Sequence, residues 1–321
     1  DFIVTDPAEQ PVVDVVQDGP VQATLRVTRR FRIPAGLDAK ERGRARKTEW
    51  MPVVMDLTLR AGESFLRASI ELINNASDHR LRALFPLGFN ADRSHADGAF
   101  YVNARGLQAE GDAHEVGLPT FPSRRWVDVS DGARGLALFH RGTPEYELVE
   151  GRALAITLLR SVAWLSRQGM RNRAGPAGPM IATPGAQLHG NHHFELAVYP
   201  HDGDWSAGRV HDVAEGFSYP LRATVARAHP GPLPTAGAAL TLEPSSVQLS
   251  ALTKNGGTVT CRVYNASADV VDARMRLGAP FANKKPRIVG LLGDERETLD
   301  VRDGVVSLPL KPWEIASIKL V

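Results

Sequence analysis

Four histidines lie within thirteen residues of one stretch of the chain, at positions 189, 192, 193 and 201. Successive residues of a strand point to opposite faces, so we expect His192 on an apolar face with Phe194, and His193 on the other face with Glu195. A zinc site needs three or four converging ligands, whereas this alternation supplies at most two on one face. Structural hydrogen bonding is the favoured interpretation; contact with a sugar or a neighbouring domain, and metal binding, are the alternatives.

Three pairs of carboxylates are close enough in sequence to suggest the acid and base of a sugar hydrolase. They are Asp128 with Asp131, Glu145 with Glu147, and Asp202 with Asp204. The first and third pairs occur where the sequence favours turns, and the second shares the outward face of one strand. We therefore interpret all three pairs as surface or turn residues and predict no catalytic residue in the chain.

Arginine and aromatic side chains suited to sugar recognition are also present. Flat aromatic rings pack on the apolar face of a pyranose, and guanidinium groups satisfy its hydroxyls. The candidate substrate contacts are Arg125, Trp126, Arg160, His189, Asn191 and His193. The alternative for the tryptophans is a role as core or loop anchors.

The sequence lacks several common motifs of other catalytic and phosphate-binding sites. The chain contains no GxSxG, HExxH or CxxC motif and no glycine-rich phosphate loop. The single cysteine, Cys261, alternates onto the apolar side of a strand and is expected to be a buried, inert thiol. With 38 basic and 36 acidic residues the net charge is +2, so we expect neither nucleic acid nor a membrane as a partner.

The elements that would position these residues are almost all strands. Residues 21–33 alternate between apolar odd positions and polar even positions, which predicts a half-buried antiparallel strand with its apolar side inward. Similar patterns predict strands at 51–59, 64–72, 80–87, 99–104, 125–129, 135–139, 145–149, 154–162 and 192–199. Helical spacing of apolar residues is clear only at 207–217. We therefore predict an all-β fold.

A second all-β pattern follows a segment rich in Pro, Gly and Ala. The predicted organisation is a large antiparallel β-supersandwich at 1–228, a linker at 229–239 and a small immunoglobulin-like β-sandwich at 240–321. The strands predicted in the last part are 240–252, 257–265, 271–278, 287–292, 297–301, 305–308 and 314–321.

A succession of motifs resembles the C-terminal region of glycoside hydrolase family 38, the retaining α-mannosidases and mannosylglycerate hydrolases. In order these are NASDHRLR at 75–82 with FP at 85–86, VDVSDG at 127–132, GLALF at 135–139, GTPEYE at 142–147, LLRSV at 158–162, TPGAQ at 183–187, HFE at 193–195, YPH at 199–201, VYN at 263–265 and PWEI at 312–315. The resemblance covers nearly the whole chain and implies a galactose-mutarotase-like supersandwich followed by a small sandwich.

The resemblance also implies what the chain lacks. In that family the zinc ion and the nucleophilic aspartate belong to an N-terminal barrel, and a further zinc ligand lies in an HHDAITG-like motif of the following helical region. Here His192 and His193 are followed by Phe and Glu. We therefore expect no cofactor and no metal in this chain, and we expect its partners to be the catalytic barrel and helical region of the same polypeptide, with zinc bound there.

The expected function is the non-catalytic C-terminal part of a zinc-dependent, retaining α-mannosidase-type hydrolase that acts on mannose-containing carbohydrate in a bacterial cytoplasm. In that role it would brace the barrel and help shape the sugar cleft, and the chain alone would be inactive. A stand-alone carbohydrate-binding module is the alternative. An acid–base enzyme of mutarotase type, using a His and a Glu, is a third hypothesis.

Overall fold

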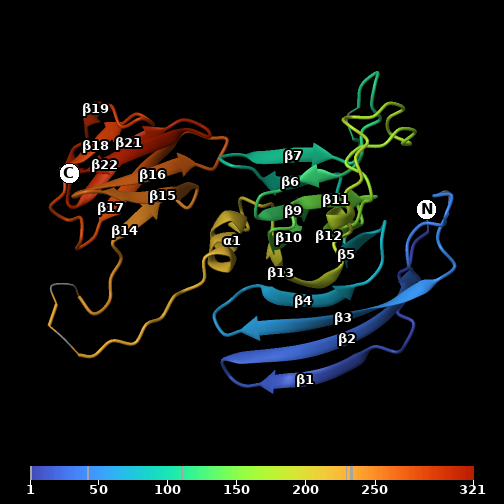
Figure 1. Cartoon of the computed structure of the whole chain (residues 1–321). Helices are drawn as coiled ribbons and strands as arrows, with labels where there is room; N and C mark the ends of the chain where they lie inside the picture. The colour runs from blue at the N-terminus through green and yellow to red at the C-terminus, as the bar shows by residue number, and fades with distance from the viewer. Residues whose placement is uncertain (1, 42, 110, 229, 232–233) are drawn as a thin grey trace. The chain divides into compact units, whose positions relative to one another are not determined.

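The computed structural model describes residues 2–41, 43–109, 111–228, 230–231 and 234–321. The chain divides into two compact units, one of residues Asp1–Ala96 and Asn103–Ser218 and one of residues Asp97–Val102 and Tyr219–Val321. Both units are built from antiparallel sheets, and the described residues form a single α-helix (Figure 1). The all-β prediction is confirmed. Part of the predicted linker, residues 229, 232 and 233, lies outside the described residues.

A nine-stranded antiparallel sheet is the larger layer of the first unit. Its order is β1 (Val12–Asp18), β2 (Gln22–Pro34), β3 (Thr48–Arg60), β4 (Leu66–Asn74), β13 (Gly190–Asp202), β10 (Arg134–Arg141), β9 (Trp126–Ser130), β6 (Arg93–Asp97) and β7 (Val102–Gly106). β13 lies at its centre, between β4 and β10, and pairs with both over almost its whole length. The histidine-rich stretch is therefore a central strand.

The second layer of this unit is a four-stranded sheet. It consists of β5 (Arg80–Pro86), β12 (Ala153–Arg160), β11 (Glu145–Val149) and β8 (Phe121–Pro122). Apolar side chains from both sheets form the core, including Ile70, Leu138 and Leu196 from the larger sheet and Leu154 and Ile156 from the smaller. A 3₁₀ turn, η1 (Pro184–Gln187), leads into β13, and the helix α1 (Val210–Ser218) follows β13.

The alternation read from residues 21–33 is confirmed as strand β2, but its predicted inward side is wrong in the first half. Val21 and Leu25 are 72% and 43% exposed, whereas Thr24 is buried. No residue of β1 or β2 belongs to the core between the two sheets, because the smaller sheet covers only the strands from β3 onward. Period-2 alternation identifies a strand, but it does not show whether a second layer covers it.

The second unit is a small sandwich of two sheets. One sheet has the order β14 (Leu240–Glu243), β17 (Val271–Leu277), β21 (Val305–Leu310) and β20 (Val301–Arg302). The other has the order β15 (Val247–Asn255), β16 (Thr258–Asn265), β22 (Ile315–Leu320), β18 (Pro286–Val289) and β19 (Glu295–Thr298). The single strand predicted at 240–252 is wrong: Pro244 interrupts it, and its two halves join different sheets. Cys261 is fully buried in this core, as predicted, and burial raises its pKa to about 11.

Candidate functional site

Two of the six predicted substrate contacts, Arg125 and Trp126, lie beneath helix α1. The side chain of Arg125 is only 10% exposed, and its guanidinium pairs with the carboxylate of Glu215 on that helix. Trp126 has no exposed surface; its ring stacks on Trp205 at 6.0 Å and meets His211 edge-on at 5.1 Å. A sugar cannot reach the Trp126 ring in this conformation. Both side chains instead anchor α1 to the sheet. For Trp126 this agrees with the alternative hypothesis, that the tryptophans are core or loop anchors.

The other four predicted contacts are exposed and lie around the start of β13. Arg160 ends β12, and its side chain is 60% exposed with Glu145 at 3.6 Å. His189 precedes β13 and its Nε2 lies 3.0 Å from the hydroxyl of Ser77. Asn191 and His193 are exposed on one face of β13. Their accessibility is compatible with contact to a ligand, and their role as contacts stays a prediction.

The histidine pair at the start of β13 divides between the two faces of the strand, as the alternation predicts. His192 stacks on Phe194 with ring centres 6.0 Å apart, and its Nε2 lies 2.7 Å from the carbonyl oxygen of Leu188. His193 points to the opposite face, where its Nδ1 lies 3.7 Å from Glu71. The two rings therefore cannot act together on one ligand.

A buried polar network fixes the segment that carries His189. Asn74, at the end of β4, is fully buried and donates from Nδ2 to the carbonyl oxygens of Gln187 and Leu188, at 3.1 and 2.9 Å. Ser161 donates to the same Gln187 oxygen at 2.8 Å. The Gln187 side chain in turn bonds the backbone N–H and the carboxylate of Asp78, at 2.8 and 2.9 Å.

Three of the sequence motifs, at 75–82, 158–162 and 183–187, meet in this network. Each hydrogen bond in it joins segments that are distant in sequence, so the β4–β5 loop, the end of β12 and η1 are held together at one end of the unit. Leu188 adopts a left-handed conformation, with φ of 55°, as the chain turns into β13. The motifs therefore specify the backbone that presents His189, Asn191 and Arg160, rather than a reactive group.

The carboxylate pairs have different environments. Asp131 accepts hydrogen bonds from the backbone N–H groups of Ala133 and Arg134, and Asp204 accepts two from the turn before α1, as turn residues do. Glu145 and Glu147 face outward and pair with arginines of β5. The surface assignment of Asp128 is wrong, because this side chain is fully buried.

Asp128 forms a buried pair with His201, which the sequence reasoning missed. The Nε2 of His201 lies 2.7 Å from Oδ1 of Asp128, and the two side chains are 2% and 0% exposed. The Nδ1 of the same ring lies 3.2 Å from the carbonyl oxygen of Asp202. When Asp128 is ionised, both partners are acceptors, and both contacts are then satisfied only if the ring carries two protons.

Electrostatics support the protonated form of this ring. Burial lowers the pKa of His201, but the hydrogen bond and the charge of Asp128 together outweigh burial and raise the pKa above its ordinary value. Burial also raises the pKa of Asp128, and the hydrogen bond from His201 offsets only part of that increase. The pair therefore holds its protons more strongly than two isolated groups would.

Glycines make room for the His201 ring. A Cβ placed on Gly135 of β10 would lie 2.1 Å from a ring atom, and one on Gly208 would lie 2.3 Å away. Both distances are far below van der Waals contact, so the ring occupies a slot that only two glycines leave open. The register of β10 against β13 sets Gly135 directly opposite His201.

Further polar atoms without partners lie around this pair. Among the described residues, Oδ2 of Asp128, Nε1 of Trp126 and both ring nitrogens of His211 are buried and lack a hydrogen bond. Burial lowers the pKa of His211 to about 4, so this ring is neutral near pH 7. The cluster is closed to substrate because its side chains are almost entirely buried. The contact of His211 with Trp126 holds α1 against the sheet.

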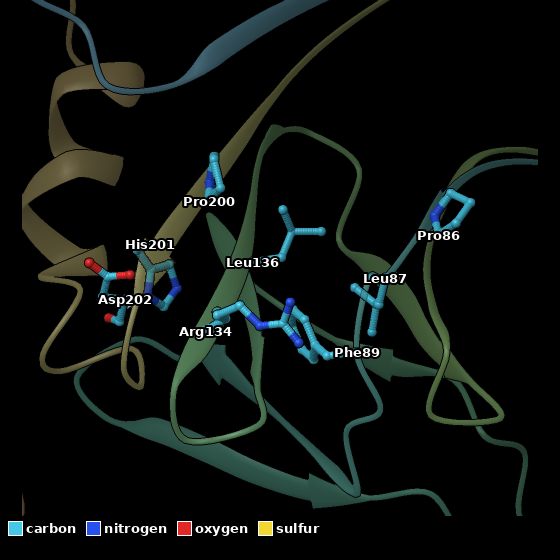
Figure 2. A pocket seen from close by; sticks show the side chains of 10 residues that line it. Pro86, Leu87, Phe89, Arg134, Leu136, Pro200, His201 and Asp202 are labelled. Carbon is cyan, nitrogen blue, oxygen red and sulfur yellow. Dashed lines mark hydrogen bonds between the residues drawn. The ribbon is translucent and has the colours of Figure 1, made fainter.

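One open hollow lies beside this region, at the ends of β10 and β13 (Figure 2). It has a volume of about 500 Å³, and Leu87, Phe89, Leu136 and Pro200 give it an apolar lining. Figure 2 shows the side chain of Arg134 beside the Phe89 ring, and the guanidinium carbon lies 5.6 Å from the ring centre. An apolar surface next to a cation suits the C–H face of a sugar.

Among the residues that the structure describes, no three His, Cys, Asp or Glu side chains lie close enough together to hold a metal ion. We therefore assign no reaction step to a metal held by these residues. The described helix is also too short to cross a membrane.

Two family descriptions match the chain. "Glycosyl hydrolases family 38 C-terminal domain" matches residues 3–168, and "Glycosyl hydrolases family 38 C-terminal beta sandwich domain" matches residues 246–318. The first covers most of the supersandwich, including the Asn74 network up to Ser161, and the second covers most of the small sandwich.

Curated relatives and solved structures agree with these matches. The chain is 27% identical over 250 residues to a protein of Halalkalibacterium halodurans provisionally named mannosylglycerate hydrolase, and 26% identical over 207 residues to alpha-mannosidase 2C1 of Mus musculus. These alignments cover 72% and 62% of this chain but only 26% and 18% of the relatives, so the chain spans about a quarter or less of their length. An alpha-mannosidase structure from Enterococcus faecalis V583 has the same fold over 100% of this chain and 37% of its own, with a TM-score of 0.81 at 20% identity.

Proposed function

The chain belongs to glycosyl hydrolase family 38, as its C-terminal domains, and from this we propose that it is the non-catalytic C-terminal part of an α-mannosidase-type hydrolase. The observation that carries the proposal is the match of both family domains, in order, to a chain that spans about a quarter of a relative such as the Halalkalibacterium protein. In this proposal the zinc ion and the retaining chemistry belong to an N-terminal catalytic barrel of the same cytoplasmic, bacterial polypeptide, and mannose-containing carbohydrate is the substrate.

The role proposed for this chain is to brace the barrel and to complete one wall of the sugar cleft. The end of the first unit that η1 and the Asn74 network form supports this role. It presents the exposed Arg160, His189 and Asn191 on backbone segments that buried hydrogen bonds hold in place. Preorganised polar groups of this kind bind a ligand with little loss of conformational entropy.

The experiment uses turnover of an aryl α-mannoside by the full-length polypeptide. Arg160→Ala and Asn191→Ala are each expected to lower kcat/KM by about 10-fold, which corresponds to the loss of one or two hydrogen bonds to the sugar. Asn283→Ala, an exposed asparagine of the second unit, is the matched control and should leave kcat/KM unchanged. Unchanged kcat/KM in both test variants would contradict the proposal that this end of the first unit forms a wall of the sugar cleft.

The 321-residue chain alone is expected to show no turnover in the same assay. Metal-dependent hydrolysis by this chain, abolished by His192→Ala or His193→Ala, would contradict the assignment of catalysis to a separate barrel. Zinc content, measured on the full-length polypeptide and on the chain alone, tests the placement of the metal independently of activity.

The hollow of Figure 2 supports a second function, sugar binding by the chain alone. Its lining of Phe89, Leu136 and Arg134 offers the accessible ring and guanidinium that the buried Trp126 and Arg125 do not. Calorimetry with mannose and oligomannosides would then show binding that Phe89→Ala weakens. Absence of heat with every sugar would exclude this function.

A further inference from the structure

The outer face of the five-stranded sheet in the small sandwich is polar and hollowed. Along β16, Cys261 and Val263 point into the core, so Thr260 and Arg262 point outward. On the neighbouring strand β22 the outward residues are Ser317 and Lys319, which are paired in register with Arg262 and Thr260. Hydroxyl groups and cations therefore lie side by side on one face.

The loop that follows β18 borders this face on one side. Residues 289–293 line one side of a hollow of about 390 Å³ whose floor includes Thr253, Thr260, Arg262 and Ser317. A turn closes the loop, since Gly290 accepts from the N–H of Gly293 at 3.0 Å and donates to Asp294 at 2.8 Å. Leu291 and Leu292 are 73% and 99% exposed and place apolar surface at the rim.

The two cations that line the hollow, Arg262 and Lys319, have different partners. Lys319 lies 3.1 Å from Glu295, and Arg287 pairs with the same carboxylate. Arg262 donates from Nε to the hydroxyl of Ser317 at 3.1 Å, and no described carboxylate lies within ion-pair distance of it. Two cations therefore share the carboxylate of Glu295, and Arg262 has no carboxylate partner among the described residues.

A guanidinium that has no carboxylate partner is available to pair with a bound anion. Arginine binds carboxylate, sulfate and phosphate groups through two parallel hydrogen bonds, and Nη1 and Nη2 of Arg262 are the atoms left for this. The hydroxyls of Thr253 and Thr260 beside it can bond further oxygens of the same ligand.

We infer that this hollow binds an acidic carbohydrate, whose oxyanion pairs with Arg262 and whose hydroxyls contact the threonine-rich floor. The shared chemistry is one oxyanion next to several hydroxyls, and the oxyanion can be a carboxylate of a sugar acid or a phosphate of a sugar phosphate. The leucines at the rim cover the C–H face of the ring. The site is independent of the function proposed for the first unit.

Calorimetric titration of the 321-residue chain with glucuronate and with mannose 6-phosphate tests the inference and separates the two sources of oxyanion. At least one of them should bind with a Kd below about 1 mM, whereas neutral mannose should bind at least about 10-fold more weakly. Arg262→Gln should weaken binding of the acidic sugar by about 10-fold or more, as expected for the loss of a charge-assisted contact.

Two further variants keep the test decisive. Arg262→Lys retains the charge without the planar fork and should give an intermediate loss. Arg274→Gln removes an exposed arginine from the other sheet of the same sandwich and should leave the Kd unchanged. The inference fails if neither acidic sugar binds, if mannose binds equally well, or if Arg262→Gln and Arg274→Gln weaken binding to the same extent.

Discussion

In each of the two units a buried asparagine ends a strand that has a neighbour on both sides, and the two asparagines join different segments. Asn74 ends β4 and Asn265 ends β16, and neither has any exposed surface. Each Oδ1 accepts the backbone N–H two residues ahead, at 3.1 Å in the first unit and 3.0 Å in the second. Each Nδ2 donates to carbonyl oxygens of other segments.

The difference lies in the segments that each side chain joins. Asn74 holds Gln187 and Leu188, which are 113 and 114 residues away, whereas Asn265 holds Asp269, four residues away, and Lys311, 46 residues away. The same local capping geometry therefore closes a long loop in the supersandwich and a short one in the small sandwich. It follows that only Asn74 controls the segment that presents the candidate contacts.

The two regions also differ in their histidines. Residues 240–321 contain none, whereas the first unit contains the buried His140 and His211. Burial lowers the pKa of each of these two rings to about 4. The stability of the two units should therefore also respond differently to acid.

Lowering the pH should produce the largest difference in folding stability between the two units. His140 and His211 are neutral in the folded state until about pH 4, but in the unfolded chain they protonate near pH 6.5. Stability that is fully present above pH 6.5 is therefore lost as the pH falls towards 4, by about 3 kcal/mol for each ring at 1.36 kcal/mol per pKa unit. Hydrogen exchange measured on peptides of each unit, and corrected for the intrinsic exchange rate at each pH, should show a larger loss of protection at low pH in the first unit than in the second.

His201 acts in the opposite direction within the same unit. Its raised pKa contributes stability below pH 6.5 that disappears as the pH rises through the folded-state value, so it offsets part of the acid effect. His211→Leu removes one of the rings whose effect opposes that of His201, and it breaks no hydrogen bond, because neither ring nitrogen of His211 has a partner in the described structure. This variant should lose part of the acid sensitivity; the rest stays with His140, and with His79 and His95, whose pKa burial also lowers. Equal acid sensitivity in the small sandwich would overturn the explanation.

Removal of either asparagine should have the next largest effect. Asn74→Ala and Asn265→Ala each leave buried carbonyl groups and one N–H without a partner, at a cost of about 3 kcal/mol to the unit that contains the change. The same loss should lower Tm by about 10 °C in the larger unit and by about 20 °C in the smaller, because the entropy of unfolding scales with size. Differential scanning calorimetry resolves the two transitions.

Asn191→Ala, which changes an exposed asparagine, is the control and should shift neither transition. In the full-length polypeptide Asn74→Ala should also reduce turnover of an aryl α-mannoside, whereas Asn265→Ala should not, since of these two asparagines only Asn74 bonds η1. A comparable loss of turnover in Asn265→Ala would show that Asn74 has no special role in presenting the candidate contacts.

A pair of glycine substitutions should give the smallest effects and the sharpest contrast. Gly135→Ala places a methyl group 2.1 Å from the ring of His201, whereas Gly290→Ala places one 2.1 Å from the carboxylate of Asp294. The ring is confined between two glycines, so Gly135→Ala should cost about 2 kcal/mol through displaced packing. Asp294 is an exposed, flexible side chain that can rotate away, so Gly290→Ala should cost less than about 1 kcal/mol.

Urea unfolding of each variant, followed separately for the two units, gives these free energies. His201→Ala combined with Gly135→Ala is the matched control, because the added methyl then meets no ring and should have no further cost. A persistent cost of Gly135→Ala in the absence of the ring would show that the glycine is needed for the backbone and not for the histidine.

Much of the architecture follows from local pattern. Apolar and polar residues alternate along β3, β4 and β13, and apolar residues recur at helical spacing in α1, so these elements are predicted close to their observed bounds. β1 was missed because its sequence, VVDVVQD, does not alternate, and its pairing with β2 contains a bulge. The two strands on either side of Pro244 were merged because a proline at an edge leaves the apolar pattern on both sides intact.

The sequence by itself determined the strands, the division of His192 and His193 between two faces and the family to which the chain belongs, because alternation and motifs are properties of neighbouring residues. Tertiary structure alone decided that Trp126 and Arg125 are closed off beneath α1 and that Asp128 is a buried partner of His201, 73 residues away. The physical reason is that burial depends on which layer covers a strand. That covering layer comes from a segment far along the chain, so no local pattern records it.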